Sequence, residues 1–303
     1  MLAHPLVRAG VTRRSRSPWM ATTLSILLAL AAFWAWTPDR DPAELAAHYQ
    51  RSPADRVELL GATLHLRDDG PRDAPVLLFL HGFGASLHTW EPWAQALAAD
   101  FRVLRVDLPG HGLSPPDPSD DYTDTRSQHL LLALLDRLGV PRVSLIGNSM
   151  GGRIAWTMAA RHPDRVDRLV LVAPDGFASP GYFEYDKAPE VSAWLQLMRV
   201  ALPRPLLRLS LAPAYANPAA LTDERLDRYH DLLRAPGARA AMLQRMRQTV
   251  LTDPVPLLKT VRAPTLLLWG ESDQMIPVAN AADYRTALPH GLNRLKHQLP
   301  IRL

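Results

Sequence analysis

The chain has 303 residues, of which 47% are hydrophobic, a formal net charge of +4 and no cysteine. Length alone would allow two domains, whereas a charge so small and so dispersed excludes a nucleic-acid-binding surface. Without cysteine there is no disulfide, and no His-Glu-x-x-His motif occurs, so neither a metal nor another cofactor is predicted.

The N-terminus has the pattern of a membrane anchor. Residues 1–19 carry arginines at 8, 13, 14 and 16 and are predicted to be a basic cytoplasmic n-region, and residues 20–36 have no charge at all. At about 1.5 Å per residue this stretch is long enough for a thin bilayer, and tryptophans at 19, 34 and 36 suit its interfaces. We therefore predict a transmembrane signal-anchor over 20–36, single-pass in a bacterial inner membrane.

The positive-inside rule then places the rest of the chain on the periplasmic side, after a linker over residues 37–54. Two alternatives remain open. Ala29-Leu30-Ala31 resembles a processing site, and cleavage of a signal peptide there would give a secreted protein. A buried amphipathic first helix is the other.

Apolar runs and helix-like segments alternate through the following residues. Each run is short and continuous, which is typical of parallel strands buried on both faces. The runs begin at Val76, Val103, Val143, Leu169 and Thr265, and helix-like segments cover residues 91–100, 127–138 and 152–162. The alternation predicts an α/β fold with a mainly parallel sheet.

One of these runs ends in a Gly-x-Ser-x-Gly motif. Residues 143–152 read Val-Ser-Leu-Ile-Gly-Asn-Ser-Met-Gly-Gly, which indicates a strand, a sharp turn and a helix with a serine at the apex. A strained turn brings its neighbours against the next strand, so Gly147 and Gly151 must lack a Cβ. Ser149 is the predicted nucleophile.

Four ordered motifs together resemble the α/β-hydrolase superfamily, over roughly residues 55–290. They are His81-Gly82-Phe83-Gly84, the segment from Asp107 to Ser114, Gly147-Asn148-Ser149-Met150-Gly151-Gly152, and the segment from Trp269 to Pro277. The resemblance implies a serine hydrolase with a sheet flanked by helices, an oxyanion hole, and a triad in the chain order Ser, Asp, His. A serine hydroxyl needs such a base, which a carboxylate orients.

The resemblance also implies the roles of the neighbouring residues. The backbone N–H groups of Phe83 and Met150 would stabilise the oxyanion, and Gly82 and Gly84 would let their loop approach the substrate. Asp273, just beyond a predicted strand, is the implied acid.

Two alternatives stand beside this acid: Asp273 only caps a following helix over 276–288, or Asp175, past another strand, is the acid. His81, His111 and Asp107 lie in turns and are interpreted as residues that support loops.

The base is the weakest part of the pattern. The family places it after the last strand, usually as Gly-His, with a closing helix behind it. Here residues 292–300 look too charged for a good buried strand, and Lys296 stands where glycine is expected. His297 is the best candidate and His290 the second, and a truncated or altered C-terminus with no working base is the third possibility.

Strand signals vanish between the fourth and fifth runs. Helical segments over 191–201, 206–211, 222–234 and 239–251 are separated by prolines, which end helices. By resemblance, residues 177–262 form a cap over a core made of 55–176 and 263–303. A helical insertion used for dimerisation is the alternative.

The sharp turn that carries Ser149 is called the elbow. Serine at this position argues against dehalogenases and epoxide hydrolases of this fold, which carry aspartate there. We predict a carboxylic ester hydrolase acting through an acyl-enzyme on a small-molecule ester or a lipidic, lipase-like substrate. A carbon–carbon bond hydrolase of the ring-fission type, whose elbow is similar, is one alternative. A non-catalytic hydrolase-fold binding protein is the other.

Overall fold

The computed structural model describes residues 18–178 and 184–296. Residues up to Trp36 form one compact unit, and Thr37–Leu303 form a second. The first unit contains a single described helix, α1 (Pro18–Ala35).

The predicted transmembrane anchor, and with it the inner-membrane location, is wrong. Among the residues described, no helix combines the length and the apolar character that crossing a bilayer requires. The 18 residues of α1 span about 27 Å, short of the roughly 30 Å hydrocarbon core. The polar side chains of Thr22, Thr23 and Ser25 also interrupt its N-terminal half, and Thr23 Oγ1 bonds back to the Trp19 carbonyl oxygen at 2.9 Å.

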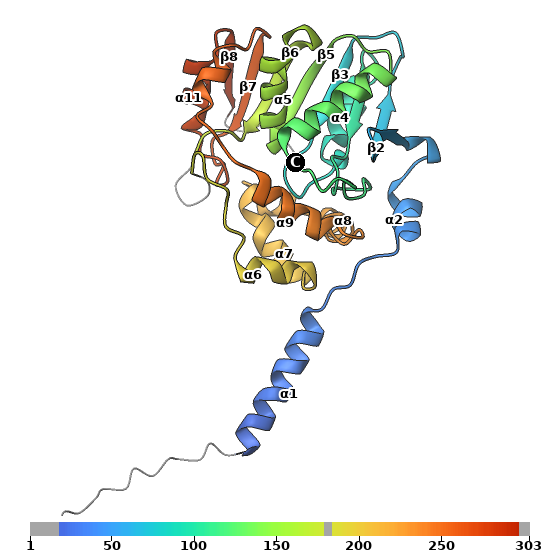
Figure 1. The fold of residues 1–303 in the computed structure, drawn as a ribbon, viewed down its shortest axis with the longest axis vertical. Coiled ribbons are helices and arrows are strands. Elements are labelled where there is room, and N and C mark those ends of the chain that lie inside the picture. The colour runs from blue at the N-terminus through green and yellow to red at the C-terminus, as the bar shows by residue number, and fades with distance from the viewer. Residues whose placement is uncertain (1–17, 179–183, 297–303) are drawn as a thin grey trace, which may run out of the picture. The chain divides into compact units, whose positions relative to one another are not determined.

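A mixed sheet organises the second unit (Figure 1). In the part of the chain that is described, eight strands stand in the order β1-β2-β4-β3-β5-β6-β7-β8. The first two pair antiparallel with their neighbours, and the other pairs are parallel. This confirms the predicted α/β fold. The bounds are β1 Arg56–Leu59, β2 Ala62–Asp69, β3 Val76–Leu80, β4 Arg102–Val106, β5 Val143–Ser149, β6 Val166–Pro174, β7 Thr265–Gly270 and β8 Gly291–Lys296.

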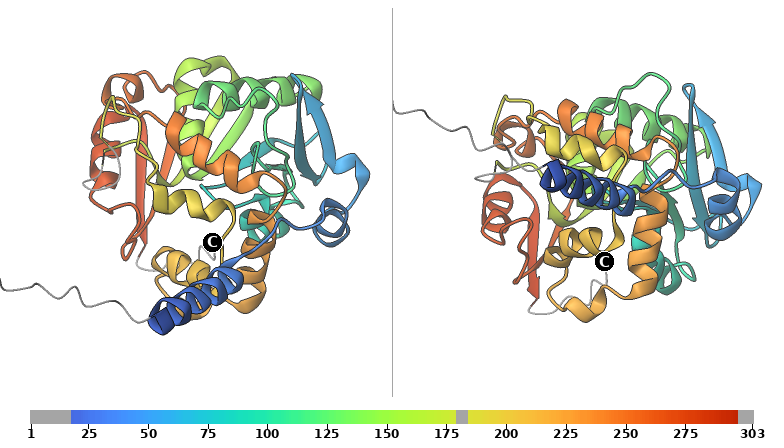
Figure 2. Two further views of the ribbon diagram at one scale, coloured as in Figure 1. Left: turned by 60° about the horizontal axis from the view of Figure 1, so that its bottom comes forward. Right: turned by 90° about the horizontal axis from the view of Figure 1, so that it is seen from below.

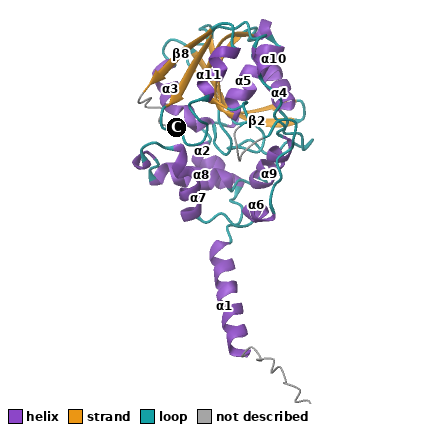
Figure 3. Ribbon diagram, turned by 90° about the vertical axis from the view of Figure 1, so that its left-hand side faces the viewer, coloured by secondary structure: helices purple, strands orange, loops and turns teal. Residues whose placement is uncertain are grey.

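Helices cover both faces of the sheet, which is why the central strands are apolar throughout. On one face, the core includes residues of α4 (Asp124–Arg137), α5 (Met150–Arg161) and α11 (Asn280–Ala287). On the other, Phe79 and Ile146 pack with Trp90 and with residues of α3 (Glu91–Leu97). Figure 3 shows this layering, with strands between helices.

The C-terminal segment does form a strand, contrary to the interpretation that it is too charged. β8 pairs in parallel with β7 from Thr265↔Gly291 to Gly270↔Lys296. It is the last strand in the sheet order, so only one of its edges is hydrogen-bonded. Natural sheets commonly place charged residues on such edges.

Between β6 and β7 the chain leaves the sheet and forms a helical layer, the cap (Figure 2). Its described helices are α6 Ala193–Gln196, α7 Arg204–Leu211, α8 Asp223–Leu233, α9 Ala238–Gln248 and α10 Val255–Leu258. Leu226, Leu233 and Met242 lie in a small hydrophobic core of its own. The prolines do separate short helices, as the sequence predicts.

The segment predicted as a linker is built into the fold. Residues 42–49 form α2 (Pro42–Tyr49), with Pro42 at its first turn and Asp41 as its N-cap. Leu45 and Tyr49 are buried against Leu113 of the core and Leu232 of the cap. The sequence offers one signal for this helix, an Asp-Pro pair followed by Ala-Glu-Leu, which is a helix start.

Candidate active site

Ser149 ends β5 and directly precedes α5. Its backbone has φ 50° and ψ −118°, a conformation that non-glycine residues rarely adopt and that is found chiefly at functional sites. Its hydroxyl makes no hydrogen bond to any residue in the described part of the chain. The elbow therefore presents the oxygen on a rigid turn.

The flanking glycines are there because of close backbone contacts. A Cβ on Gly147 would lie 2.4 Å from the Gly151 carbonyl oxygen, and one on Gly151 would lie 2.4 Å from the Leu80 carbonyl oxygen. Contacts this short are not tolerated, so both positions require glycine. The turn is thereby pressed against the end of β3.

The loop after β3 lies beside the elbow. A Cβ on Gly82 would lie 3.5 Å from Ser149 Cβ, so the loop that carries Phe83 and Gly84 runs next to Ser149. On the other side, Met150 is the first residue of α5, where the backbone N–H has no acceptor within the helix. Both predicted oxyanion-hole residues thus border Ser149.

His81 supports this loop. It is fully buried, its Nε2 accepts a hydrogen bond from the Leu108 backbone N–H at 3.0 Å, and its Nδ1 donates to the Gly82 carbonyl oxygen at 2.8 Å. With both nitrogens occupied and its pKa lowered by burial, this imidazole is neutral and structural.

Asp107 is likewise a structural carboxylate. It accepts hydrogen bonds from the backbone N–H groups of Leu87 and Leu113 and from Nδ1 of buried His65. Although burial alone would raise its pKa, these bonds and the neighbouring imidazoles lower it well below the usual range. His111 stacks near His81, with ring centroids 5.0 Å apart.

Asp273 lies three residues beyond β7. Its Oδ1 accepts the N–H groups of Met275 at 2.8 Å and Ile276 at 2.9 Å, while Oδ2 has no partner among the described residues. Burial raises its pKa and the two N–H donors oppose that rise. The carboxylate is held in place with one oxygen available to a further donor.

Asp175, the second acid candidate, is already paired. It follows β6, its backbone N–H donates to the Ser149 carbonyl oxygen at 3.0 Å, and its Oδ2 accepts from Arg153 at 2.7 Å. Arg153 also donates to both oxygens of Asp124, at 2.8 and 3.2 Å. Burial raises the pKa of Asp175, and the Arg153 charge counters this.

The Asp124–Arg153–Asp175 cluster escaped sequence reasoning. Arg153 stands four residues after Ser149, so on a helix the two share a face. That spacing could have marked it, but its partners come from α4 and from the end of β6, and only the fold brings them together.

Of the two histidine candidates, the structure places His290 at the end of the sheet opposite to Ser149. The carbonyl oxygen of His290 accepts the N–H of Thr265 at 3.2 Å. His290 therefore stands at the amino end of β7 and β8, whereas Ser149 and Asp273 follow the carboxyl ends of β5 and β7. His297 lies outside the described residues.

A cavity of about 240 Å³ opens at Ser149. Arg153 and Asp175 provide the charged part of its wall, and the remainder is mostly apolar. The other lining residues are Phe83, Met150, Phe177, Met246, Thr249, Met275 and Ile276. The cap contributes Met246 and Thr249, at the end of α9.

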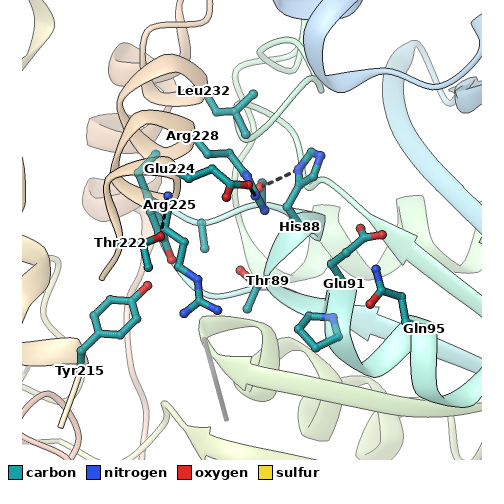
Figure 4. A pocket seen from close by; sticks show the side chains of 15 residues that line it. His88, Thr89, Glu91, Gln95, Tyr215, Thr222, Glu224, Arg225, Arg228 and Leu232 are labelled. Carbon is teal, nitrogen blue, oxygen red and sulfur yellow. Dashed lines mark hydrogen bonds and ion pairs between the residues drawn. The ribbon is translucent and has the colours of Figure 1, made fainter. Parts of the chain in front are cut away.

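A second cleft, of about 330 Å³, lies between α8 and the segment that leads into α3 (Figure 4). It is polar, and side chains such as Tyr215 and Arg225 face Thr89 and Glu91 across it. Glu91 is engaged by Arg51, Arg67 and Arg105. Burial lowers the pKa of His88 to about 3. Ser149 does not line this cleft, so we place the chemistry in the smaller cavity.

Known proteins share this architecture. One relative, from Pseudomonas putida, is named the dihydrolipoyllysine-residue acetyltransferase component of the acetoin cleaving system. It is 31% identical over 79% of this chain and 63% of its own length. The chain thus spans less than two-thirds of that relative. A second relative is a 2-hydroxy-6-oxononadienedioate/2-hydroxy-6-oxononatrienedioate hydrolase from Cupriavidus pinatubonensis. It is 29% identical over 77% of this chain and 84% of its own length.

Among solved structures, a membrane phospholipase A described as a bacterial virulence factor is 27% identical, with a TM-score of 0.66 over 91% of this chain and 90% of its own. The family model for the alpha/beta hydrolase fold matches residues 75–299, which include every strand from β3 onward. The chain belongs to the α/β-hydrolase fold family.

Proposed function

We propose that this protein is a serine hydrolase that cleaves carboxylic esters with an apolar acyl chain through an acyl-enzyme. Ser149 is the nucleophile, His297 the general base and Asp273 the carboxylate that orients it. The N–H groups of Phe83 and Met150 hold the oxyanion.

The strained backbone of Ser149 is the observation that carries the proposal. A residue at φ 50° is kept there only because the surrounding contacts enforce it. The hydroxyl, which has no hydrogen-bond partner among the described residues, opens into the 240 Å³ cavity, next to the first N–H of α5. Attack on an acyl carbonyl at this point would place the developing oxyanion near that donor, and one such donor contributes about 2.7–4 kcal/mol.

The edge of the sheet supports the choice of base. Lys296 pairs with Gly270, three residues before Asp273, so the chain leaves β8 at the same edge at which the Asp273 turn leaves β7. His297 is the next residue in the sequence. A base supplied there would meet Oδ2 of Asp273, which no described residue engages.

The cavity wall supports an apolar acyl group. Phe83, Phe177, Met246 and Ile276 offer hydrocarbon and thioether surface, and methionine adapts to flexible chains. The similarity to a phospholipase A supports a lipidic ester in particular.

Reaction with a fluorophosphonate probe and turnover of p-nitrophenyl esters test the proposal. We expect labelling at Ser149, loss of labelling in Ser149→Ala, and hydrolysis of p-nitrophenyl butyrate or longer esters. Labelling that persists in Ser149→Ala would refute the nucleophile. An unmutated protein that is labelled but hydrolyses no ester would refute the substrate class.

A carbon–carbon bond hydrolase is the second candidate, because a relative 29% identical carries that kind of name. Its named substrates are dicarboxylates, which require free cations. Among the described residues that line the cavity the only cation is Arg153, and two carboxylates already occupy it. Decay of the absorbance of a 2-hydroxy-6-oxo-dienoate, in place of ester turnover, would favour this candidate.

A further inference from the structure

Residues 37–40, which we call the strap, are bound along the cap. The backbone N–H of Thr37 donates to the Val200 carbonyl oxygen at 2.9 Å, and its Oγ1 accepts from the Leu202 N–H at 2.6 Å. Arg40 pairs with Asp231 of α8 at 2.7 Å. The strap thus touches several parts of the cap in four residues.

Arg239 is the main contact between the strap and α9. Its guanidinium is 4% exposed and donates to the Thr37 carbonyl oxygen at 2.7 Å and to Asp39 Oδ1 at 2.6 Å. Arg234, just before α9, donates to the Pro38 carbonyl oxygen at 2.8 Å. Hydrogen bonds from a charged donor, such as these, are stronger than those between neutral groups.

The helix fixed in this way forms one wall of the Ser149 cavity. One turn beyond Arg239, the Met242 methyl lies 3.4 Å from the position of a Cβ on Gly84, in the loop that carries Phe83. Two turns beyond, Met246 lines the cavity itself. A shift of the first turns of α9 would therefore move the loop beside Met242, whose Phe83 lines the cavity.

We propose that the strap determines the acyl-chain specificity of this hydrolase, with Arg239 as the positioning residue that transmits it. The far end of α9 has its own attachment, because Arg245 donates to the Tyr122 carbonyl oxygen at 2.9 Å. Release of the strap loosens only the first turns of α9, so the loop beside Met242 recedes with Phe83, which lines the cavity, while the far end of α9 keeps the cap in place. The kinetic consequence rests on the proposed ester hydrolysis, whereas the structural one does not.

Arg239→Ala in the full chain tests this, with Arg247→Ala, an exposed arginine on the same helix, as the matched control. We expect kcat/KM for p-nitrophenyl decanoate to fall by about tenfold to a hundredfold, chiefly through KM, as is usual for a misplacement of about 1 Å. The value for p-nitrophenyl acetate falls less, because a short acyl group reaches less of the displaced wall. Asp39→Ala, which leaves the Thr37 contacts intact, gives a smaller change of the same kind.

Hydrogen exchange supplies a readout independent of activity. Amides of residues 238–242 should exchange at least about tenfold faster in Arg239→Ala, while those of residues 245–248 are unchanged. Unchanged exchange at the start of α9, or an equal loss for acetate and decanoate, would overturn the proposal. If no variant hydrolyses any ester, the proposed function fails and the exchange rates still decide the role of the strap.

Discussion

Gly147→Ala should disable the elbow without unfolding the protein. The added Cβ would lie 2.4 Å from the Gly151 carbonyl oxygen and 2.6 Å from the Gly152 nitrogen. Ordinary contacts begin near 3.4 Å, so the strand end and α5 must separate by about 1 Å. A displacement of this size at a nucleophile costs about a hundredfold in rate, or about 2.7 kcal/mol of activation free energy. Overpacking lowers the free energy of unfolding by about 1–3 kcal/mol.

The assay is the rate constant for fluorophosphonate labelling, measured beside the thermal midpoint. Gly270→Ala is the matched control, because a Cβ there meets nothing within 4 Å, although Gly270 also ends a central strand near the site. We expect the control to label at the normal rate. Gly147→Val, with a branched side chain, should not label at all. If Gly147→Ala labels as fast as the control, the close contact does not set the nucleophile geometry.

Three further predictions concern charge. In urea titrations, Arg153→Leu, which strips two largely buried carboxylates of their cation, should lower the free energy of unfolding by about 3–5 kcal/mol. Arg142→Leu, at an exposed pair, should lower it by at most about 1 kcal/mol. His88 has a pKa of about 3 against a reference of 6.5, so the unfolded chain binds the extra proton between these values. As the pH falls through this window, His88 therefore lowers the free energy of unfolding by about 1.4 kcal/mol per pH unit. Between pH 7 and pH 5, the free energy of unfolding of His88→Gln should fall by less than that of the unmutated protein. Finally, His297→Ala should reduce ester turnover at least about a hundredfold and His290→Ala hardly at all, and equal losses would contradict the assignment.

The parts of the fold that local sequence determines were predictable. Each central strand is a continuous apolar run, and the elbow has its own glycine pattern. β8 was misjudged because its charged sequence was compared with a buried strand, while its place at the sheet edge depends on the order of all the strands. The antiparallel β1 and β2 were not recognised, since Arg67, Asp68 and Asp69 obscure their pattern. Asp69 pairs with Arg51, Asp68 with Arg102 and Arg67 with Glu91, and all three partners are distant in sequence.

The N-terminal region shows the limit of composition as an argument. An uncharged stretch with flanking tryptophans predicts an anchor, yet its helix is short and three polar side chains interrupt its first half. The residues after it were interpreted as a linker because they are polar. Their charges, however, are the means of attachment, since Asp39 and Arg40 find partners about 200 positions away.

The choice between the two acids follows from what each carboxylate already binds. Asp175 gives Oδ2 to Arg153 at 2.7 Å, and its backbone ties the elbow to β6. Asp273 is fixed by two backbone donors on Oδ1, and its Oδ2 has no partner among the described residues. An imidazolium is best stabilised by an oriented carboxylate that no other cation has paired, and of these two only Asp175 has an arginine partner in the described part of the chain.

Asp273→Asn should therefore reduce ester turnover by about ten-thousandfold, because an amide holds the imidazole in the wrong tautomer, with little change in the thermal midpoint. Asp175→Asn should do the reverse. It weakens the pair with Arg153 and so lowers the thermal midpoint. Turnover by the folded fraction stays within about tenfold of the unmutated protein, because a change in packing away from the reacting atoms costs less rate than the loss of general-base catalysis. If Asp175→Asn is the inactive variant and Asp273→Asn turns over normally, the carboxylate paired with Arg153 is the acid, and the base must approach Ser149 from the side of β6.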